Sequence, residues 1–193
     1  MDQKINEKII TELKIQGKSD RTIKMYSYFN KDFLNYINKS PNLIDEDDIK
    51  KYLSYLIDYK KYNPSSLSLA LSALRFYYDA ILKKKITTDI KNPKKYRTIP
   101  NILTKEEILK LIDSSFSLKT KLMIEFMYAS GLRVSECANL KIEDINLRDK
   151  TGLLRLGKGK KDRFFILSDR LIKDMIEFLD SRRSGYVFTG KKD

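Results

Sequence analysis

The stretch YASGLRVSE, residues 128–136, places an arginine just after a helix-breaking glycine. It closes a run, 118–129, that is apolar on almost every side, which predicts a buried helix ended by Gly131. A further helix is expected from Arg133 onward, with Arg133 and Glu136 on one face because they are three positions apart. Taken alone, this spacing is more typical of an ordinary surface ion pair than of a functional site, so its meaning depends on the rest of the chain.

The composition limits what the chain can bind and how it can react. Its 193 residues, 41% hydrophobic and 34% charged, suffice for one large domain or two small ones. A net charge of +13 predicts a polyanionic partner, in the first place nucleic acid. The absence of histidine excludes a His/Cys metal site and a Ser-His-Asp or Cys-His mechanism. The single cysteine, Cys137, is expected in the core of a cytoplasmic protein.

The first 85 residues have the periodicity of helices. Apolar residues recur three to four positions apart over 23–37, 49–57 and 67–81, and more weakly over 5–13. Helix-start signals precede the three stronger stripes: Ser19 or Asp20, the acidic run DEDD, and Asn63 or Ser65 within NPSS. Four helices with short loops predict a small bundle. No apolar run reaches the roughly 20 residues that a membrane span needs, so no membrane partner is expected.

The composition changes after residue 83. The segment 83–101 carries two prolines and little apolar periodicity, which predicts a linker. Thr104 and Glu107 then form a capping-box pattern ahead of another helix. LLRL (153–156) and RFFIL (163–167) flank a glycine-rich basic turn and predict a β-hairpin. One more helix is expected over 171–179 and a short strand at YVF, 186–188.

These elements predict a mainly α fold with a small β-hairpin or sheet, of the α+β class. The expected organisation is a helical domain over 1–86, a linker over 87–102 and a second domain over 103–193.

Most of the positive charge lies in two segments. Residues 83–97 carry a local +6 and residues 155–163 a local +4, so 24 residues account for +10 of the +13. A single basic run is as often a solvated face as a binding site. Two such runs, one on a linker and one on a hairpin, favour a duplex that is held from two sides.

The arginine motif and the hairpin together resemble the tyrosine recombinase/integrase family, including its Xer-type members. In that family a small residue precedes Gly-Leu-Arg-x-Ser-Glu, and a GKGxKxR hairpin follows; here Arg133 and Lys158 are 25 residues apart. The family's Ser-x-x-Thr-x-x-x-Tyr pattern is matched by Ser19, Thr22 and Tyr26. IPNILTKEE resembles the end of the family's linker. The resemblance covers nearly the whole chain and implies a four-helix SAM-like core-binding bundle followed by part of a catalytic domain.

The resemblance also implies an activity: site-specific recombination of double-stranded DNA through a phosphotyrosyl intermediate, in a tetramer of protomers and without a cofactor or metal. Arg133 would bind phosphate oxygens with its planar fork, and Lys158 would protonate the leaving 5′-hydroxyl. Glu136 would support the site. The expected DNA contacts are Lys18, Arg21, Thr22, Lys24, Lys94, Lys95, Arg97, Arg155, Lys160, Lys161 and Arg163.

Part of the family's site has no match in the chain. The family continues with His-x-x-Arg, a His or Trp, and a nucleophilic tyrosine, whereas this sequence contains neither His nor Trp. Most of its twelve tyrosines lie in the N-terminal helices with apolar spacing, where packing is the expected role. Tyr128 is expected to be buried, and Tyr186 lies in the expected short strand rather than where the family has its nucleophile, so no nucleophile is assigned. The chain is therefore expected to be truncated in its catalytic domain, which leaves its standing as an enzyme open.

Two alternatives remain. The chain is a non-catalytic DNA-binding module that occupies recombination sites or pairs with a full-length recombinase, or it is a basic helical binder of RNA or of a membrane surface. The latter ranks last, because the basic runs lie on a linker and a turn rather than on an amphipathic helix.

Overall fold

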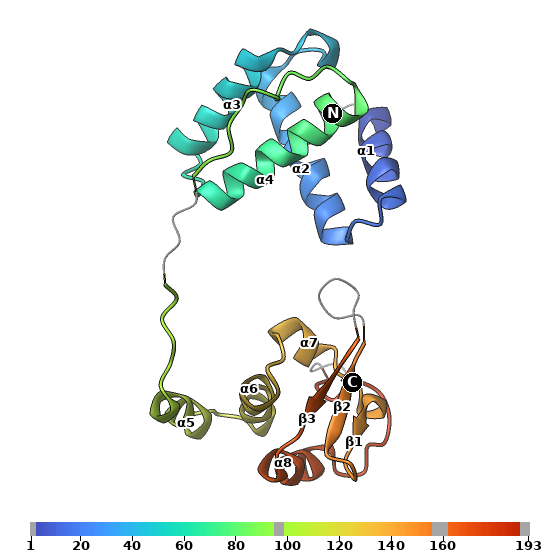
Figure 1. Ribbon diagram of the computed structural model, residues 1–193, viewed down its shortest axis with the longest axis vertical. Coiled ribbons are helices and arrows are strands. Elements are labelled where there is room, and N and C mark those ends of the chain that lie inside the picture. The colour runs from blue at the N-terminus through green and yellow to red at the C-terminus, as the bar shows by residue number, and fades with distance from the viewer. Residues whose placement is uncertain (1–2, 95–98, 156–161, 190–193) are drawn as a thin grey trace. The chain divides into compact units, whose positions relative to one another are not determined.

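The computed structural model describes residues 3–94, 99–155 and 162–189 (Figure 1). The chain divides into two compact units, Met1–Ile99 and Pro100–Asp193, each with its own hydrophobic core. The first unit is built from α1 (Gln3–Ile15), α2 (Asp20–Ile37), a 3-10 turn (Pro41–Leu43), α3 (Glu46–Asp58), α4 (Pro64–Arg75) and a π-helical segment (Phe76–Ile81).

Short-range polar contacts start the helices of the first unit. The Ser19 hydroxyl accepts a hydrogen bond from the Thr22 N–H, so Ser19 rather than Asp20 caps α2. Asp45 and Asp48 form a capping box at α3, and the Asn63 side chain caps α4. The third predicted helix is regular only as far as Arg75; the rest of its stripe continues as the π-helical segment.

The core of the first unit is rich in aromatic residues. Phe29 and Phe33 of α2 pack with Tyr52 of α3 and Leu71 and Leu74 of α4, all of them nearly or fully buried. The Tyr52 hydroxyl leaves this core at one end and donates to the Asp32 carboxylate at 2.6 Å. Tyrosine suits such a position because its ring is buried while its hydroxyl finds a partner.

The segment that follows the π-helical turn packs back onto the first unit. Thr87 is fully buried, its N–H donates to Asp79 Oδ1 at 3.1 Å, and the Arg75 guanidinium donates to the carbonyls of Thr87 and Ile90. Ile86 and Ile90 pack against the first core. Residues 86–90 therefore belong to the packed part of the first unit, although their sequence is typical of a linker.

The second unit combines helices with a three-stranded antiparallel sheet of order β1-β2-β3. Its elements are α5 (Lys105–Asp113), α6 (Leu118–Ser130), α7 (Val134–Ala138), a 3-10 turn (Ile142–Asp144), β1 (Ile145–Asn146), β2 (Thr151–Leu154), β3 (Arg163–Ile166) and α8 (Asp169–Leu179). Helix α6 contacts α8 and β3. This is the mainly α fold with a small sheet that the sequence predicts.

The predicted hairpin is present as β2 and β3, with Leu154 opposite Arg163. Strand β1 was not predicted from the sequence, because two residues are too few to show an alternating pattern. The predicted strand at YVF is wrong: Tyr186 forms a single bridge with Lys141, while Val187 and Phe188 are buried in the core. Their apolar character reflects burial rather than sheet pairing.

Gly152 in β2 allows the sheet to sit closely on Phe165 of β3. A Cβ at this position would lie 2.1 Å from the Phe165 ring. Strand β3 buries Phe165 and exposes Phe164 and Ile166, as alternation along a strand requires. The residue opposite Phe165 must therefore have no side chain.

Two expectations for single residues have different outcomes. Cys137 is fully buried, as predicted, with its Sγ 3.9 Å from the Met123 carbonyl, and burial raises the pKa of its thiol to about 12. Tyr128 was expected to be buried but is 55% exposed. Helix α6 buries one stripe, formed by Leu122, Glu125 and Phe126, rather than its whole surface. In the part of the chain that the structure describes, none of the helices has the length and hydrophobicity needed to cross a bilayer.

Candidate functional site

The turn between α6 and α7 sets the direction of Arg133. Gly131 ends α6 in the left-handed conformation, with φ of 60°, which glycine adopts without steric cost. Leu132 is buried and anchors the turn in the core. Arg133 then has extended backbone angles and immediately precedes α7. The sequence predicted Arg133 and Glu136 on one face of a helix. In the structure only Glu136 lies in α7, and Arg133 is the residue just before it.

Glu136 holds Arg133 at two points. Its Oε2 accepts the backbone N–H of Arg133 at 2.9 Å, and its Oε1 accepts Nη1 of the same residue at 2.7 Å. The Glu136 side chain is 8% exposed, whereas that of Arg133 is 56% exposed. A buried carboxylate thus fixes a guanidinium that remains open to solvent, which differs from a solvated surface pair.

A second arginine reaches the same carboxylate. Nη2 of Arg163, at the start of β3, donates to Glu136 Oε2 at 3.0 Å and to the Gly131 carbonyl at 3.1 Å. Sequence analysis placed Arg163 only among the expected DNA contacts. Its link to Glu136 crosses 27 positions of sequence, so no local spacing could have revealed it.

These contacts hold the pKa of Glu136 at about 2, well below its ordinary value. The Arg133 backbone N–H lowers the pKa most; burial opposes this, and the hydrogen bonds from the Arg133 and Arg163 side chains lower it further. At neutral pH the cluster therefore comprises one carboxylate and two guanidinium groups. Its positive excess suits an anion such as a phosphate.

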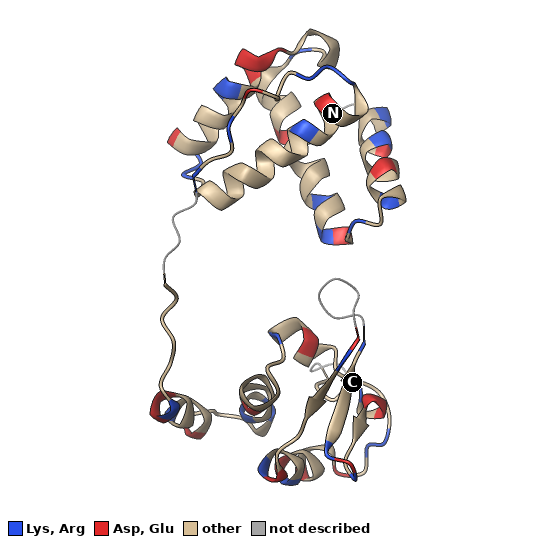
Figure 2. Ribbon diagram, in the orientation of Figure 1, with Lys and Arg blue, Asp and Glu red and all other residues tan. Residues whose placement is uncertain are grey.

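The other expected DNA contacts are distributed over both units, as are the Lys and Arg positions coloured blue on the ribbon of Figure 2. Lys18, Arg21 and Lys24 are exposed around the start of α2, and Lys94 is exposed as well. The Thr22 hydroxyl is shared with the α2 cap, 2.9 Å from the Ser19 hydroxyl. The remaining expected contacts Lys95, Arg97, Lys160 and Lys161, and the expected acid Lys158, lie outside the described residues.

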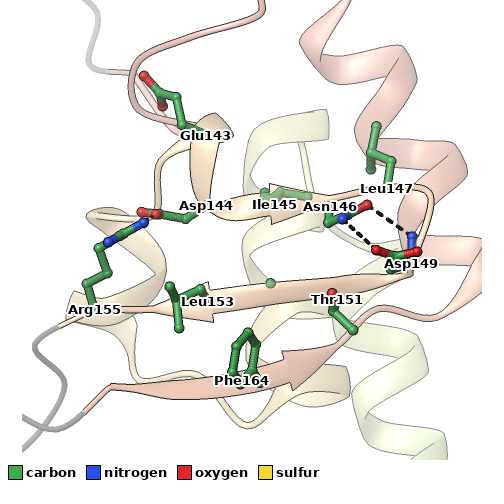
Figure 3. Close-up of a pocket in the computed structure, with 11 residues that line it drawn as sticks. Glu143, Asp144, Ile145, Asn146, Leu147, Asp149, Thr151, Leu153, Arg155 and Phe164 are labelled. Carbon is green, nitrogen blue, oxygen red and sulfur yellow. Dashed lines mark hydrogen bonds and ion pairs between the residues drawn. The ribbon is translucent and has the colours of Figure 1, made fainter.

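Arg155 is engaged within the protein. Its Nε donates to the Asp144 carboxylate at 2.7 Å, at one end of a hollow of about 620 Å³ on the sheet (Figure 3). Asn146 and Asp149 are hydrogen-bonded to each other near the other end, and Phe164 lies between (Figure 3). Arg133 and Glu136 do not line this hollow, so it is separate from the arginine cluster.

Among the described residues there is no group of three Cys, Asp or Glu side chains that could hold a metal ion. The carboxylates of 45–48 act at the start of α3, where Asp45 and Asp48 form the capping box and Lys39 pairs with Asp48 at 2.7 Å.

Two family models together account for most of the chain. Residues 5–88 match the phage integrase N-terminal SAM-like domain, and residues 101–193 match the phage integrase family. The chain belongs to the tyrosine recombinase/integrase family. The predicted resemblance is therefore confirmed, including the SAM-like character of the first unit.

Relatives of known name support this membership. The chain is 35% identical over 192 residues to tyrosine recombinase XerA of Pyrococcus horikoshii, covering 97% of this chain and 65% of that protein. It is 36% identical over 186 residues to tyrosine recombinase XerA of Pyrococcus furiosus, covering 94% and 63% respectively. The chain thus spans slightly less than two thirds of the length of these recombinases.

The fold is also found in a solved integrase. A lambda integrase (75-356) dimer bound to a COC′ core site aligns with a TM-score of 0.76 at 17% identity, covering 98% of this chain and 73% of that one. At this identity the similarity concerns the fold alone.

Proposed function

We propose that the chain binds duplex DNA and holds one backbone phosphate at Arg133, as part of a site-specific recombinase. The observation that carries this proposal is the fixed but solvent-open guanidinium of Arg133, anchored through both its backbone and its side chain by the buried Glu136. A rigid cation of this kind loses little conformational freedom when it meets an anion. Family membership supplies the reaction in which such a phosphate contact is used.

The chemistry is the transfer of a DNA phosphoryl group to a tyrosine. Attack of a tyrosine oxygen on phosphorus forms a 3′-phosphotyrosyl bond, breaks the bond to the 5′-oxygen and releases a 5′-hydroxyl once that oxygen is protonated. Arg133 would neutralise the charge that grows on the non-bridging oxygens. Lys158 is proposed as the acid, and Glu136 as the group that keeps Arg133 in place. No tyrosine of this chain is assigned as the nucleophile.

The proposed division of labour follows the two matched domains. Residues 1–86 would clamp the duplex, and residues 103–193 would contribute the phosphate site. Of the predicted linker 87–102, residues 87–90 pack on the first unit, so the connection would begin after Ile90. The proposed partners are double-stranded DNA and further recombinase protomers, and the proposed location is the cytoplasm. Among structures of similar fold, a lambda integrase tetramer bound to a Holliday junction illustrates such an assembly.

A scan of single phosphates tests the role of Arg133. A duplex enriched from a random library by the wild-type chain is prepared with one neutral methylphosphonate at each position in turn. If Arg133 binds one phosphate, one position should weaken wild-type binding by about tenfold or more. The Arg133→Ala variant should lose its sensitivity to the methylphosphonate at that one position and keep the wild-type response at all others. Equal profiles for the two proteins would reject the assignment, and DNA binding without this coupling would favour a non-catalytic module.

Covalent trapping on a nicked suicide duplex, read on a denaturing gel, tests the assignment of no nucleophile. We expect salt-sensitive binding without an adduct. An adduct would show that a tyrosine of the 193 residues attacks DNA, and that the assignment is wrong. Failure to bind any duplex would reject the proposed function itself.

A further inference from the structure

Arg163 connects three parts of the second unit through one nitrogen. It is the first residue of β3, and its Nη2 contacts both the Glu136 carboxylate, in α7, and the Gly131 carbonyl, at the end of α6. Glu136 in turn holds Arg133. The hairpin is therefore joined to the arginine motif by a chain of hydrogen bonds between side chains and backbone.

We propose that Arg163 is a positioning residue, which fixes the Arg133–Glu136 pair relative to the β2–β3 hairpin rather than binding DNA itself. This inference deepens the proposed function, on which it rests, because it concerns the same phosphate site. It departs from the expectation, drawn from the sequence, that Arg163 contacts DNA.

The contacts of the two arginines differ in the way that these roles require. Nη2 of Arg163 is already shared by two protein oxygens, and the side chain is 39% exposed. Arg133 is 56% exposed, and of its guanidinium nitrogens only Nη1 donates to an oxygen of the described residues, Glu136 Oε1. Each arginine gives one guanidinium nitrogen to the described residues, but Nη2 of Arg163 meets two protein oxygens whereas Nη1 of Arg133 meets one. Arg133 is also the more exposed of the two, so its guanidinium is the more open to a phosphate.

The position of Arg163 in the hairpin explains what it would fix. Arg163 pairs with Leu154 across the strands, and the residues between these two include Lys158, the proposed acid. The contacts of Arg163 hold the first residue of β3 at the α6–α7 turn. They therefore fix, relative to Arg133, the point at which the segment between β2 and β3 ends. Groups that act on one phosphate need such mutual alignment, since small misplacements are costly for rate.

The first test measures the Glu136 carboxyl in the DNA-free chain. NMR titration of its side-chain carbon should give a pKa near 2 in the wild type. Arg163→Gln should raise this pKa by about one unit, and Arg163→Lys, which keeps the charge, should retain most of the lowering. The matched control is Arg155→Gln, which removes one hairpin charge that pairs with Asp144 instead and should leave the Glu136 pKa unchanged.

A Glu136 pKa that does not respond to Arg163→Gln would overturn the proposal. Backbone chemical shifts recorded on each variant show whether it is folded. Arg163→Lys provides the conservative comparison if the glutamine variant unfolds.

The second test is a double-mutant cycle in the methylphosphonate scan. Arg163→Gln should reduce the discrimination at the phosphate read by Arg133, about threefold or more, and should have no further effect in an Arg133→Ala background. The slope of log affinity against log salt should stay unchanged. A sensitivity lost at a different phosphate, together with a slope reduced by about 0.9, would show that Arg163 binds DNA directly.

The two tests separate this inference from the proposed function. If the wild-type chain binds no duplex, the proposed function fails, and the titration of Glu136 alone decides whether Arg163 positions the pair.

Discussion

Glu136 accepts hydrogen bonds from one backbone N–H and from two guanidinium groups, and these bonds lower the pKa of its carboxyl. Its pKa in the folded chain is about 2, whereas an unfolded glutamate titrates near its ordinary value of about 4.3. A carboxyl with a lowered pKa adds stability above its unfolded pKa, and that stability is lost as the pH falls toward 2. Acid should therefore weaken the second unit over this interval.

We predict that Glu136→Gln destabilises the chain at pH 7 by about 1–3 kcal/mol, because two cations and a backbone donor lose a buried anion. The difference from the wild type should shrink as the pH is lowered from about 5 to 2. Urea unfolding at a series of pH values, followed by circular dichroism, measures this. A difference that is constant over that range would contradict the depressed pKa.

At the level of residues, the sequence predicted Arg133 and Glu136 because their spacing is local. It could not predict the role of Arg163, since the Glu136 contact depends on how a strand 27 positions away is placed. The same holds for Arg155, whose partner Asp144 lies 11 positions away. Charge alone assigned both arginines to DNA, whereas each is paired within the protein.

Helices α6 and α8 meet around acidic side chains. Glu125 of α6 is 6% exposed and lies 3.3 Å from Arg170, while Asp174 of α8 pairs with Lys121 at 3.1 Å. Burial, and then the charge of Asp174, raises the pKa of Glu125. For a carboxyl with a raised pKa, ionisation costs stability as the pH rises from its unfolded pKa through the folded one.

We predict that Glu125→Gln raises the melting temperature at pH 7, because the neutral amide keeps the shape and removes a buried charge. The gain should disappear near pH 3, where the carboxyl is largely protonated in both states. Thermal unfolding at both pH values measures the difference. A variant that is less stable than the wild type at pH 7 would mean that the Arg170 pair outweighs the cost of burial.

Strand β2 offers a test of packing in the sheet. Gly152→Ala would place a Cβ 2.1 Å from the Phe165 ring, too close for either group to stay in place. We expect a loss of stability of about 1–3 kcal/mol. Thr151→Ser on the same strand is the control for a small change without a clash.

Replacing the Phe165 ring with a smaller side chain should relieve the clash that Gly152→Ala creates. In the double variant with Phe165→Leu, the alanine should cost less than it does alone. Equal costs in both backgrounds, measured by denaturant unfolding, would show that the ring is not what requires the glycine.

At the level of elements, local signals sufficed for the helix starts. The capping boxes at Asp45 and Thr104 are closed within four residues, so their sequences carry the whole pattern. Burial was harder to predict. The run 122–129 is apolar except for Glu125, yet Tyr128 is exposed because α6 is covered on one side only. Which apolar residues are covered depends on neighbouring elements.

The chain as a whole carries a charge of +13, and this governs its proposed interaction with DNA. Each phosphate contact made by a lysine or arginine contributes about −0.9 to the slope of log affinity against log salt. We predict that replacing Lys18, Arg21 and Lys24 with glutamine makes the slope shallower by up to about 2.7. Fluorescence anisotropy at several salt concentrations measures it.

An equal loss of charge elsewhere on the first unit is the control. Lys8, Lys14 and Lys31 are exposed on α1 and α2, and their replacement should change the slope less. Equal effects of the two sets would mean that the start of α2 attracts DNA only through the net charge.

At the scale of the molecule, the change in composition after residue 83 indicated a division of the chain, but not where packing ends. Thr87 looks like a linker residue in sequence and is fully buried in the structure. Its contacts with Asp79 and Arg75 form only after the chain has folded back. The proline and lysine content of a segment cannot show that it folds back onto the preceding helices.

The buried Cys137 makes the chain convenient for thiol labelling. Only a thiolate reacts readily with maleimides, and a buried thiol with a pKa of about 12 supplies almost none at neutral pH. Cysteines introduced at the exposed positions Thr11 and Ser184 should therefore be labelled in the native protein while Cys137 stays unlabelled. A dye at each of these positions would then report, by energy transfer between single molecules, how the separation of the two units changes when duplex DNA is added.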